Sequence, residues 1–356
     1  MISEGKRILV TGGTGSMGKT FVRREEGLSM KRVLVTGGCG YVGGAVVDAL
    51  IEMGHDVRVY DVLLYEEQYR KLVPFVRGDV RDVAKLREHL EWADSVVCLA
   101  ALVGDGACAL NTEITVELNF KSVEWLRQHF DGRIVFASTC SVYGAQDGEL
   151  VETSPINPLS LYAATKIQAE AALADSDAVS FRLGTLFGVG DEFSRIRLDL
   201  VVNTLTVRAH EQGRISVFGG DQFRPLLHVK DAARAFAKAV EQPNRGVYNL
   251  AAKNTRIIDI AYQIRGHFPD SAIEVSKAMF QDTRNYRVSA ARAIKEVDFR
   301  PRFSLDDGIE EIKQLILEGR IRDTGLDRYS NQAYLSALLK RESSALSFRD
   351  AGALVG

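Results

Sequence analysis

The sequence has few cysteines, little net charge and no long apolar run. The formal net charge of its 356 residues is −2, so no overall positive field would attract nucleic acid or an anionic membrane. No apolar stretch reaches the roughly 18 residues that a membrane helix needs, and the N-terminus lacks the apolar run of a signal peptide. We therefore expect a cytoplasmic protein that binds neither nucleic acid nor membranes.

The four cysteines show no pairing pattern. They form no C-x-x-C pair, and no histidine cluster lies near them. This arrangement is typical of reduced, buried thiols and not of a zinc site. We expect no bound metal, and the cysteines in question are Cys39, Cys98, Cys108 and Cys140.

Short apolar runs alternate with amphipathic stretches from about residue 32 to residue 138. Such alternation predicts an α/β fold with a parallel, doubly wound sheet, in which ligands bind at the carboxyl ends of the strands. The predicted strands are 32–36, 57–60, 75–80, 95–101 and 133–138, and the predicted helices are 41–53, 83–92 and 112–129.

The chain begins with an internal duplication at an offset of 25 residues. Residues 7–18 read R-I-L-V-T-G-G-T-G-S-M-G, and residues 32–43 read R-V-L-V-T-G-G-C-G-Y-V-G. The first copy also matches the phosphate-loop pattern G-x-x-x-x-G-K-[ST] at 13–20, which alone would favour an ATPase or GTPase. However, its helix would end near Gly27, too early for a βαβ unit of roughly 30 residues or more. We interpret residues 1–29 as an appendage.

The second copy predicts a dinucleotide site of Rossmann type. Gly37, Gly40 and Gly43 let the backbone turn tightly and approach a pyrophosphate at a helix N-terminus. Asp61 ends the next strand, where a carboxylate accepts bonds from ribose hydroxyls and repels a 2′-phosphate, so we expect NAD. Asp79 is expected to meet the adenine amino group. Further cofactor contacts are expected from Tyr41, Val42, Val80, Leu99, Ala100, Ala101 and Ser138.

A tyrosine and a lysine lie four residues apart on a predicted helix. Tyr162 and Lys166 share one helix face, where the ammonium is expected to lower the pKa of the phenol from about 10. Tyr162 could then exchange a proton with a substrate hydroxyl. Thr139, at the end of a strand 23 residues earlier, is expected to hydrogen-bond that hydroxyl.

Seven motifs in this order resemble the extended short-chain dehydrogenase/reductase family, in its NAD-dependent epimerase/dehydratase group. The resemblance implies that Tyr162, Lys166 and Thr139 are catalytic. It also implies a nucleotide-diphosphate sugar as substrate and a homodimer. Arg224 and Arg284 are expected to contact the diphosphate, and Asn203 the nucleotide. The motifs are T-G-G-C-G-Y-V-G at 36–43, G-D-V at 78–80, L-A-A at 99–101, S-T-C-S-V-Y-G at 138–144, Y-A-A-T-K at 162–166, R-L-G-T-L-F-G at 182–188 and R-P-L-L-H-V-K-D at 224–231.

One departure from the family pattern bears on the reaction. Family 4,6-dehydratases carry an Asp-Glu pair directly after the catalytic Thr, whereas this chain has Cys140 and Ser141. Neither is a carboxylic acid, which disfavours water elimination. The sequence therefore predicts a nucleotide-sugar epimerase that acts by transient oxidation at sugar C4. An NAD(P)H-dependent 4-keto sugar reductase and a non-catalytic NAD(H) sensor or scaffold remain as alternatives.

The same patterns divide the chain into four parts. We expect an appendage at 1–29, an NAD-binding Rossmann domain at 30–190 to which 220–250 return, a smaller α/β substrate-binding lobe at 191–320, and a peripheral tail at 321–356 with a helix at 331–341.

A chain that begins at Met30 is expected to fold and to retain its cofactor and its activity, because the second copy carries the whole βαβ unit. Thermal denaturation and quantification of bound NAD measure this. Loss of NAD from the shortened chain, or loss of activity in Lys19→Ala, would show that the first copy builds the nucleotide site.

Overall fold

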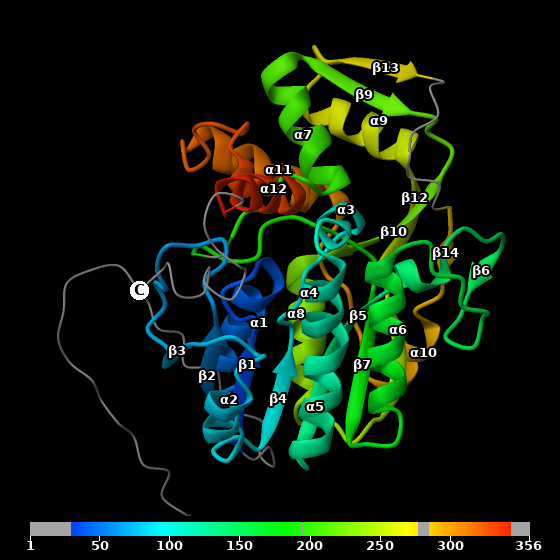
Figure 1. The fold of residues 1–356 in the computed structure, drawn as a ribbon. Helices are drawn as coiled ribbons and strands as arrows, with labels where there is room; N and C mark the ends of the chain where they lie inside the picture. The colour runs from blue at the N-terminus through cyan, green and yellow to red at the C-terminus, as the bar shows by residue number, and fades with distance from the viewer. Residues whose placement is uncertain (1–29, 194, 277–284, 343–356) are drawn as a thin grey trace, which may run out of the picture.

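A parallel sheet of seven strands forms the centre of the molecule (Figure 1). The computed structural model describes residues 30–193, 195–276 and 285–342. Every neighbouring pair in the sheet is parallel, which confirms the predicted α/β Rossmann fold. The strand order is β11 (Gly246–Leu250), β7 (Ala178–Leu183), β5 (Arg133–Thr139), β4 (Ser95–Cys98), β1 (Arg32–Thr36), β2 (Asp56–Asp61) and β3 (Phe75–Arg77).

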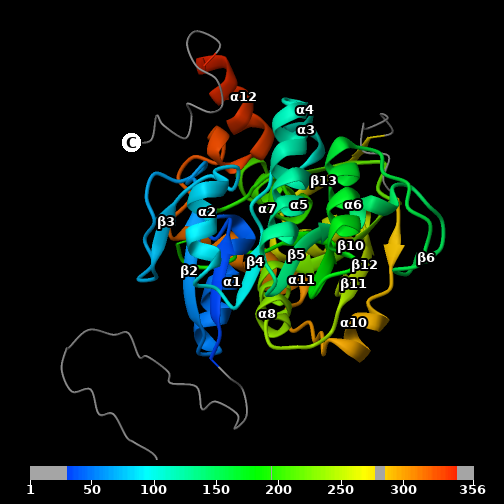
Figure 2. The same cartoon turned by 60° about the horizontal axis from the view of Figure 1, so that its bottom comes forward.

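Helices cover both faces of this sheet because successive strand residues point to opposite sides. Val33 and Val35 of β1 pack in one core with α1 (Tyr41–Glu52) and α8 (Val229–Ala239). Leu34 packs in a second core on the other face, where Figure 2 shows the covering helices. These helices are α2 (Val83–Leu90), α5 (Ser122–His129) and α6 (Leu161–Leu173).

The predicted helix at 112–129 contains a π-helical turn that the sequence pattern did not predict. The order is α4 (Thr112–Val116), a π segment at Glu117–Lys121, and then α5. Asn119 in this turn is buried; its amide accepts from the main-chain N–H of Leu102 at 2.9 Å and donates to the Leu102 carbonyl at 2.9 Å. The π turn therefore fixes the loop that follows β4, in keeping with the frequent use of such turns near functional sites.

A smaller unit lies over the carboxyl ends of the main strands (Figure 1). Of the segment 220–250, expected to return to the Rossmann domain, residues 223–228 instead pair with β8 (Thr185–Phe187) and β12 (Lys253–Arg256) of this unit, whereas 246–250 join the main sheet as β11. One apolar core holds the helices of this unit against its strands. Its elements are β8 (Thr185–Phe187), α7 (Val201–Gln212), β9 (Arg214–Phe218), β10 (Phe223–His228), β12 (Lys253–Arg256), α9 (Ile257–His267), β13 (Ala272–Ser276) and α11 (Leu305–Leu317).

The segment 321–356, expected to be a peripheral tail, contains the helix predicted at 331–341, but this helix packs more closely than a peripheral tail would. Helix α12 (Asn331–Glu342) packs against α3 (Asp105–Ala109), and Leu335 is only 1% exposed. The mixed polarity of the segment hid this contact, because one buried leucine makes a weak amphipathic signal. Residues 343–356 lie outside the described residues. The remaining short elements are η2 (Cys140–Tyr143), β6 (Glu149–Leu150), β14 (Arg287–Val288), α10 (Ala291–Glu296) and η3 (Asp327–Tyr329).

No helix within the described ranges combines the length and the apolarity that crossing a membrane requires.

A buried ion pair joins α6 to the main sheet. The guanidinium of Arg182 on β7 lies 2.7 Å from the Glu170 carboxylate, and both side chains are less than a tenth exposed. The Ser138 hydroxyl donates to Glu170, and Arg182 also donates to the Tyr143 hydroxyl at 2.9 Å. Because every charge here has a partner, the network fixes α6 relative to β5 and β7.

Replacement of Glu170 by Ala is expected to destabilise the fold by roughly 3–5 kcal/mol, because it leaves the buried Arg182 charge uncompensated. The control is Glu274→Ala, which breaks an exposed pair with Arg214 and is expected to cost less than about 1 kcal/mol. Denaturant unfolding measures both. Equal losses in the two variants would contradict the role assigned to the buried pair.

Candidate active site

One large cavity lies where the carboxyl ends of the main strands meet the smaller unit. Its volume is about 1100 Å³. That exceeds the roughly 300–1,000 Å³ of a pocket for one small ligand, so it has room for a dinucleotide and a second ligand. Most of the residues predicted to bind the cofactor line it, namely Gly37, Gly40, Tyr41, Val42, Gly43, Asp61, Asp79, Val80, Leu99, Ala100, Ala101 and Ser138.

The turn between β1 and α1 can exist only with glycine at two positions. Gly37 has a φ of +78°, and a Cβ there would lie 2.6 Å from the main-chain nitrogen of Ala100. A Cβ on Gly43 would lie 2.1 Å from the Gly37 carbonyl oxygen. The backbone thus forms an open cradle at the N-terminus of α1, where N–H groups and the helix dipole favour a phosphate.

Asp61 occupies the expected place at the end of β2. Its carboxylate accepts main-chain N–H bonds from Cys39 at 3.0 Å and Leu63 at 2.7 Å. Burial raises the pKa of Asp61, while these two hydrogen bonds favour the ionised form. The carboxylate is held rigidly at the wall of the cavity, where its remaining lone pairs can accept from a ribose.

Asp79 is already engaged by a cation that the sequence reasoning missed. The Arg81 guanidinium lies 2.6 Å from the Asp79 carboxylate and 3.2 Å from that of Glu117, and Arg81 lines the cavity. Any contact of Asp79 with adenine therefore shares its carboxylate with Arg81. The turn after β3 places the Arg81 guanidinium beside the Asp79 carboxylate. The G-D-V motif at 78–80 does not specify the geometry of this turn.

Tyr162, Lys166 and Thr139 all line the same cavity. Ser160 caps α6 by accepting from the Ala163 N–H at 3.2 Å, so Tyr162 lies in the first helical turn. Lys166 is 3% exposed, and its ammonium nitrogen lies 6.0 Å from the centre of the Tyr162 ring. The end of β5 presents Thr139 to the tyrosine from the sheet side.

Burial controls the protonation of Tyr162 and Lys166. It lowers the pKa of Lys166 to about 8 and raises the pKa of the Tyr162 phenol. The Cys108 thiol raises the pKa of Tyr162 further, whereas Arg197 and a hydrogen bond with Thr139 lower it. The expected lowering of the phenol pKa by Lys166 is therefore wrong for the protein's own groups, because desolvation outweighs the favourable charges.

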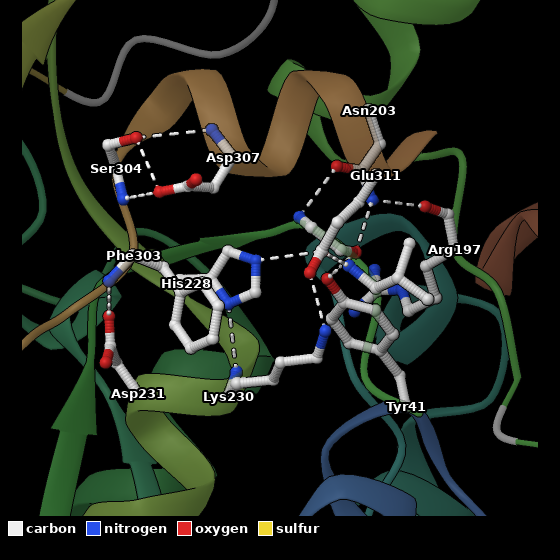
Figure 3. Close-up of polar contacts among 12 residues, drawn as sticks. Tyr41, Arg197, Asn203, His228, Lys230, Asp231, Phe303, Ser304, Asp307 and Glu311 are labelled. Carbon is white, nitrogen blue, oxygen red and sulfur yellow. Dashed lines mark hydrogen bonds and ion pairs between the residues drawn. The ribbon is translucent and has the colours of Figure 1, made fainter. Parts of the chain in front are cut away.

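Two other expectations about side chains need correction or restriction. Ser138 is 2% exposed and its hydroxyl donates to Glu170, so its side chain serves the buried network. Asn203 is fully buried and does not line the cavity. Its amide bonds to the main chain of Gly188 and of Arg197 instead, and Figure 3 shows the contact with Arg197. The motif located Asn203 on α7 but did not reveal that it lies on the inner face of the helix.

Of the two arginines expected to contact the diphosphate, the described residues include Arg224. Arg224 on β10 is 6% exposed, lines the cavity and donates to the Phe223 carbonyl at 2.9 Å. Arg284 lies outside the described residues.

A hydrogen bond from Tyr41 ties the cofactor turn to the smaller unit, and Figure 3 draws Tyr41 with Asn203 and Glu311 of that unit. The Tyr41 hydroxyl donates to the Gly188 carbonyl at 2.7 Å, and the Asn203 amide accepts from the Gly188 N–H at 3.0 Å. Glu311 accepts from the next N–H, that of Val189, at 2.7 Å and contacts the buried His228 ring at 3.0 Å. The Tyr41 bond joins the two walls of the cavity, and the other bonds hold residues 188 and 189 within the smaller unit.

Further cavity residues carry no motif that sequence reasoning could have used. They come from the segment before α7, from α7 itself, from the turn between β9 and β10 and from the tail helix, and the main ones are Arg195, Arg197, Arg208, Gln222, Asn331 and Tyr334. Only contacts between distant segments bring them together.

The fold and the site together define a Rossmann protein with a tyrosine–lysine pair beside a dinucleotide cradle. Residues 33–251 match the NAD dependent epimerase/dehydratase family. The chain belongs to this family, which confirms the predicted resemblance and NAD as the family's cofactor.

Relatives named as epimerases and relatives named as dehydratases are both similar to this chain. The chain is 27% identical to the UDP-glucose 4-epimerase of Corynebacterium glutamicum over 291 residues, which covers 73% of this chain and 87% of the relative. It is 29% identical to a dTDP-glucose 4,6-dehydratase of Actinoplanes over 325 residues, covering 86% and 96%. Among solved structures, MoeE5 in complex with UDP-glucuronic acid and NAD is similar with a TM-score of 0.70 and 25% identity, covering 81% of this chain and 99% of that one.

Replacement of Gly43 by Ala is expected to abolish retention of NAD, because its Cβ would collide with backbone that cannot move without closing the cradle. The matched control is Gly266→Ala on α9, where no atom lies within 4 Å of the added Cβ. We expect that variant to bind NAD normally and to gain up to about 1 kcal/mol of stability. Mass spectrometry of released nucleotide and denaturant unfolding test the pair, and normal NAD content in Gly43→Ala would contradict the cradle.

Proposed function

We propose that this chain is an NAD-dependent nucleotide-sugar epimerase that acts by transient oxidation at sugar C4. The observation that carries the proposal is the convergence of Tyr162, Thr139 and Lys166 on the cavity that also contains the glycine cradle. The substrate is a nucleoside diphosphate sugar, whose diphosphate fits the guanidinium of Arg224.

In this proposal Thr139, Tyr162 and Lys166 have separate tasks. Thr139 hydrogen-bonds the C4 hydroxyl, and the Tyr162 oxygen takes its proton as the carbon is oxidised and returns it when the carbon is reduced. Lys166 contributes a positive charge and binds a ribose hydroxyl. NAD, when bound, supplies the hydride acceptor and donor together with a positively charged ring. No proton or electron pair is consumed over the cycle, so the net result is inversion at C4.

Burial gives the bound ligands a large influence over this proton transfer. The raised pKa of Tyr162 leaves the phenol protonated in the protein's own field. A positive charge placed beside it in a dry cavity acts with little screening and favours the phenolate. The base is thus strengthened when the oxidised cofactor is in place, which suits a cycle that starts with oxidation.

The positions after Thr139 favour epimerisation over dehydration. Cys140 is fully buried, its thiol donates to the Arg182 carbonyl at 3.2 Å, and it does not line the cavity. Ser141 lines the cavity but carries no acid that titrates near neutral pH. Elimination of water needs an acid and a base at the sugar, and these two positions provide neither.

Tyr162→Phe is expected to lower turnover by roughly 10²- to 10⁴-fold while NAD stays bound, because it removes the proton carrier and leaves the cradle intact. A panel of nucleotide sugars, incubated without added cofactor, measures interconversion of C4 epimers. The control is Tyr262→Phe, an exposed tyrosine on α9 whose loss should leave turnover unchanged. Near-normal epimerisation by Tyr162→Phe would refute the mechanism, and turnover only with stoichiometric NAD(P)H would indicate the reductase instead.

A further inference from the structure

The cavity wall contains a buried arginine whose charge has no ion-pair partner within the part of the chain that the structure describes. Arg195 is 4% exposed and lines the cavity. Its guanidinium donates to the Asn331 amide oxygen and, at 3.2 and 3.1 Å, to the Arg328 carbonyl, all of which are neutral acceptors. Its plane stacks on the Tyr65 ring at 3.6 Å. The guanidinium is therefore well held but not neutralised.

The two nearby carboxylates are already paired with other arginines. Asp199 lies 2.9 Å from Arg197, and Glu66 lies 3.0 Å from Arg328. These pairs leave the charge of Arg195 in excess. Burial lowers the pKa of Arg195 to about 10, which reflects the free energy of keeping this cation out of water. An uncompensated buried charge is strongly unfavourable unless something else neutralises it.

Asn331 fixes this arrangement from the tail helix. Its amide oxygen accepts from Arg195, its amide nitrogen donates to the Val103 carbonyl at 2.7 Å, and its main-chain N–H donates to Asp199 at 2.8 Å. Asn331 is itself 4% exposed. A neutral amide is the group that suits this place, because an Asp would neutralise Arg195 and lose the bond to residue 103.

We propose that Arg195 binds a phosphate group of the bound nucleotide, and that Asn331 is the positioning residue that holds its guanidinium at the cavity wall. The inference rests on the proposed function, since it takes its anion from the dinucleotide or from the nucleotide sugar. The position of Tyr65 four residues after Asp61, and of Val103 two residues after the L-A-A motif, places Arg195 beside segments that line the cofactor end of the cavity. Helix α12 thereby becomes part of the nucleotide site.

The test uses the full chain, stripped of bound nucleotide, with calorimetric titration of NAD, UDP and dTDP. Arg195→Met removes the charge and keeps an apolar stem on Tyr65. We expect the Kd for at least one probe to rise about 10- to 100-fold, as loss of a charge-assisted hydrogen bond predicts. The Kd should also become less dependent on salt. The Tm without nucleotide should stay the same or rise, because the uncompensated charge is gone.

Asn331→Asp is the second, isosteric variant. It leaves Arg195 in place but neutralises it, so the same probe should bind more weakly, again with a flatter salt dependence. Its control is Gln212→Glu, which adds one negative charge at the exposed end of α7 and should change no Kd.

The outcomes separate the sources of the phosphate. Weaker binding of NAD alone assigns it to the dinucleotide, and weaker binding of UDP or dTDP alone assigns it to the nucleotide sugar. Unchanged Kd values in both variants, with or without a fall in Tm, would overturn the inference and leave the proposed function standing. Failure of the unaltered protein to bind any of the three probes would overturn both.

Discussion

The close approach of the turn after β1 to the backbone after β4 is the constraint on which the site depends. Gly37 is so near the main chain of Ala100 that a single added carbon would overlap it. Because β1, β4 and β5 are neighbours in one sheet, this contact also fixes the end of β5 relative to the cradle. Thr139, and Tyr162 across from it, are thereby set at a defined distance from any bound pyrophosphate.

The second determinant is the exclusion of water from Tyr162 and Lys166. Burial moves Lys166 toward its neutral form near pH 8 and keeps the Tyr162 phenol protonated. The phenol is thus uncharged in the protein's own field, whereas Lys166, whose pKa of about 8 lies above neutral pH, remains mostly protonated. Charges that enter with ligands are poorly screened in such a site. In the proposed mechanism, proton transfer is therefore controlled by what is bound as much as by the fixed residues.

Sequence reasoning succeeded where short-range patterns determine the structure. The buried run at 32–36, the helix beginning at Tyr41 and the acid at Asp61 all lie as predicted, because strand, turn and helix signals are local. It failed where the burial of a side chain determines its orientation or its pKa. The orientation of Asn203 and the pKa of Tyr162 depend on what packs around them, which spacing along a helix cannot reveal. The role of α12 depends on contacts more than 130 residues apart in sequence, such as that between Arg195 and Asn331.

The contacts at Gly188 bear on how substrates are selected. Tyr41 from the cofactor turn and Asn203 from α7 hydrogen-bond the same glycine, and Glu311 holds the residue that follows it. Of these bonds, that of Tyr41 crosses between the two walls, so separation of the walls would leave its buried hydroxyl and the Gly188 carbonyl without each other, while the bonds from α7 and α11 hold residues 188 and 189 within the smaller unit. The walls are thus held at one spacing. Under the proposed function, selection among nucleotide sugars then comes from the side chains that line the cavity, and chiefly from those before α7 and on α12 that no family motif specifies.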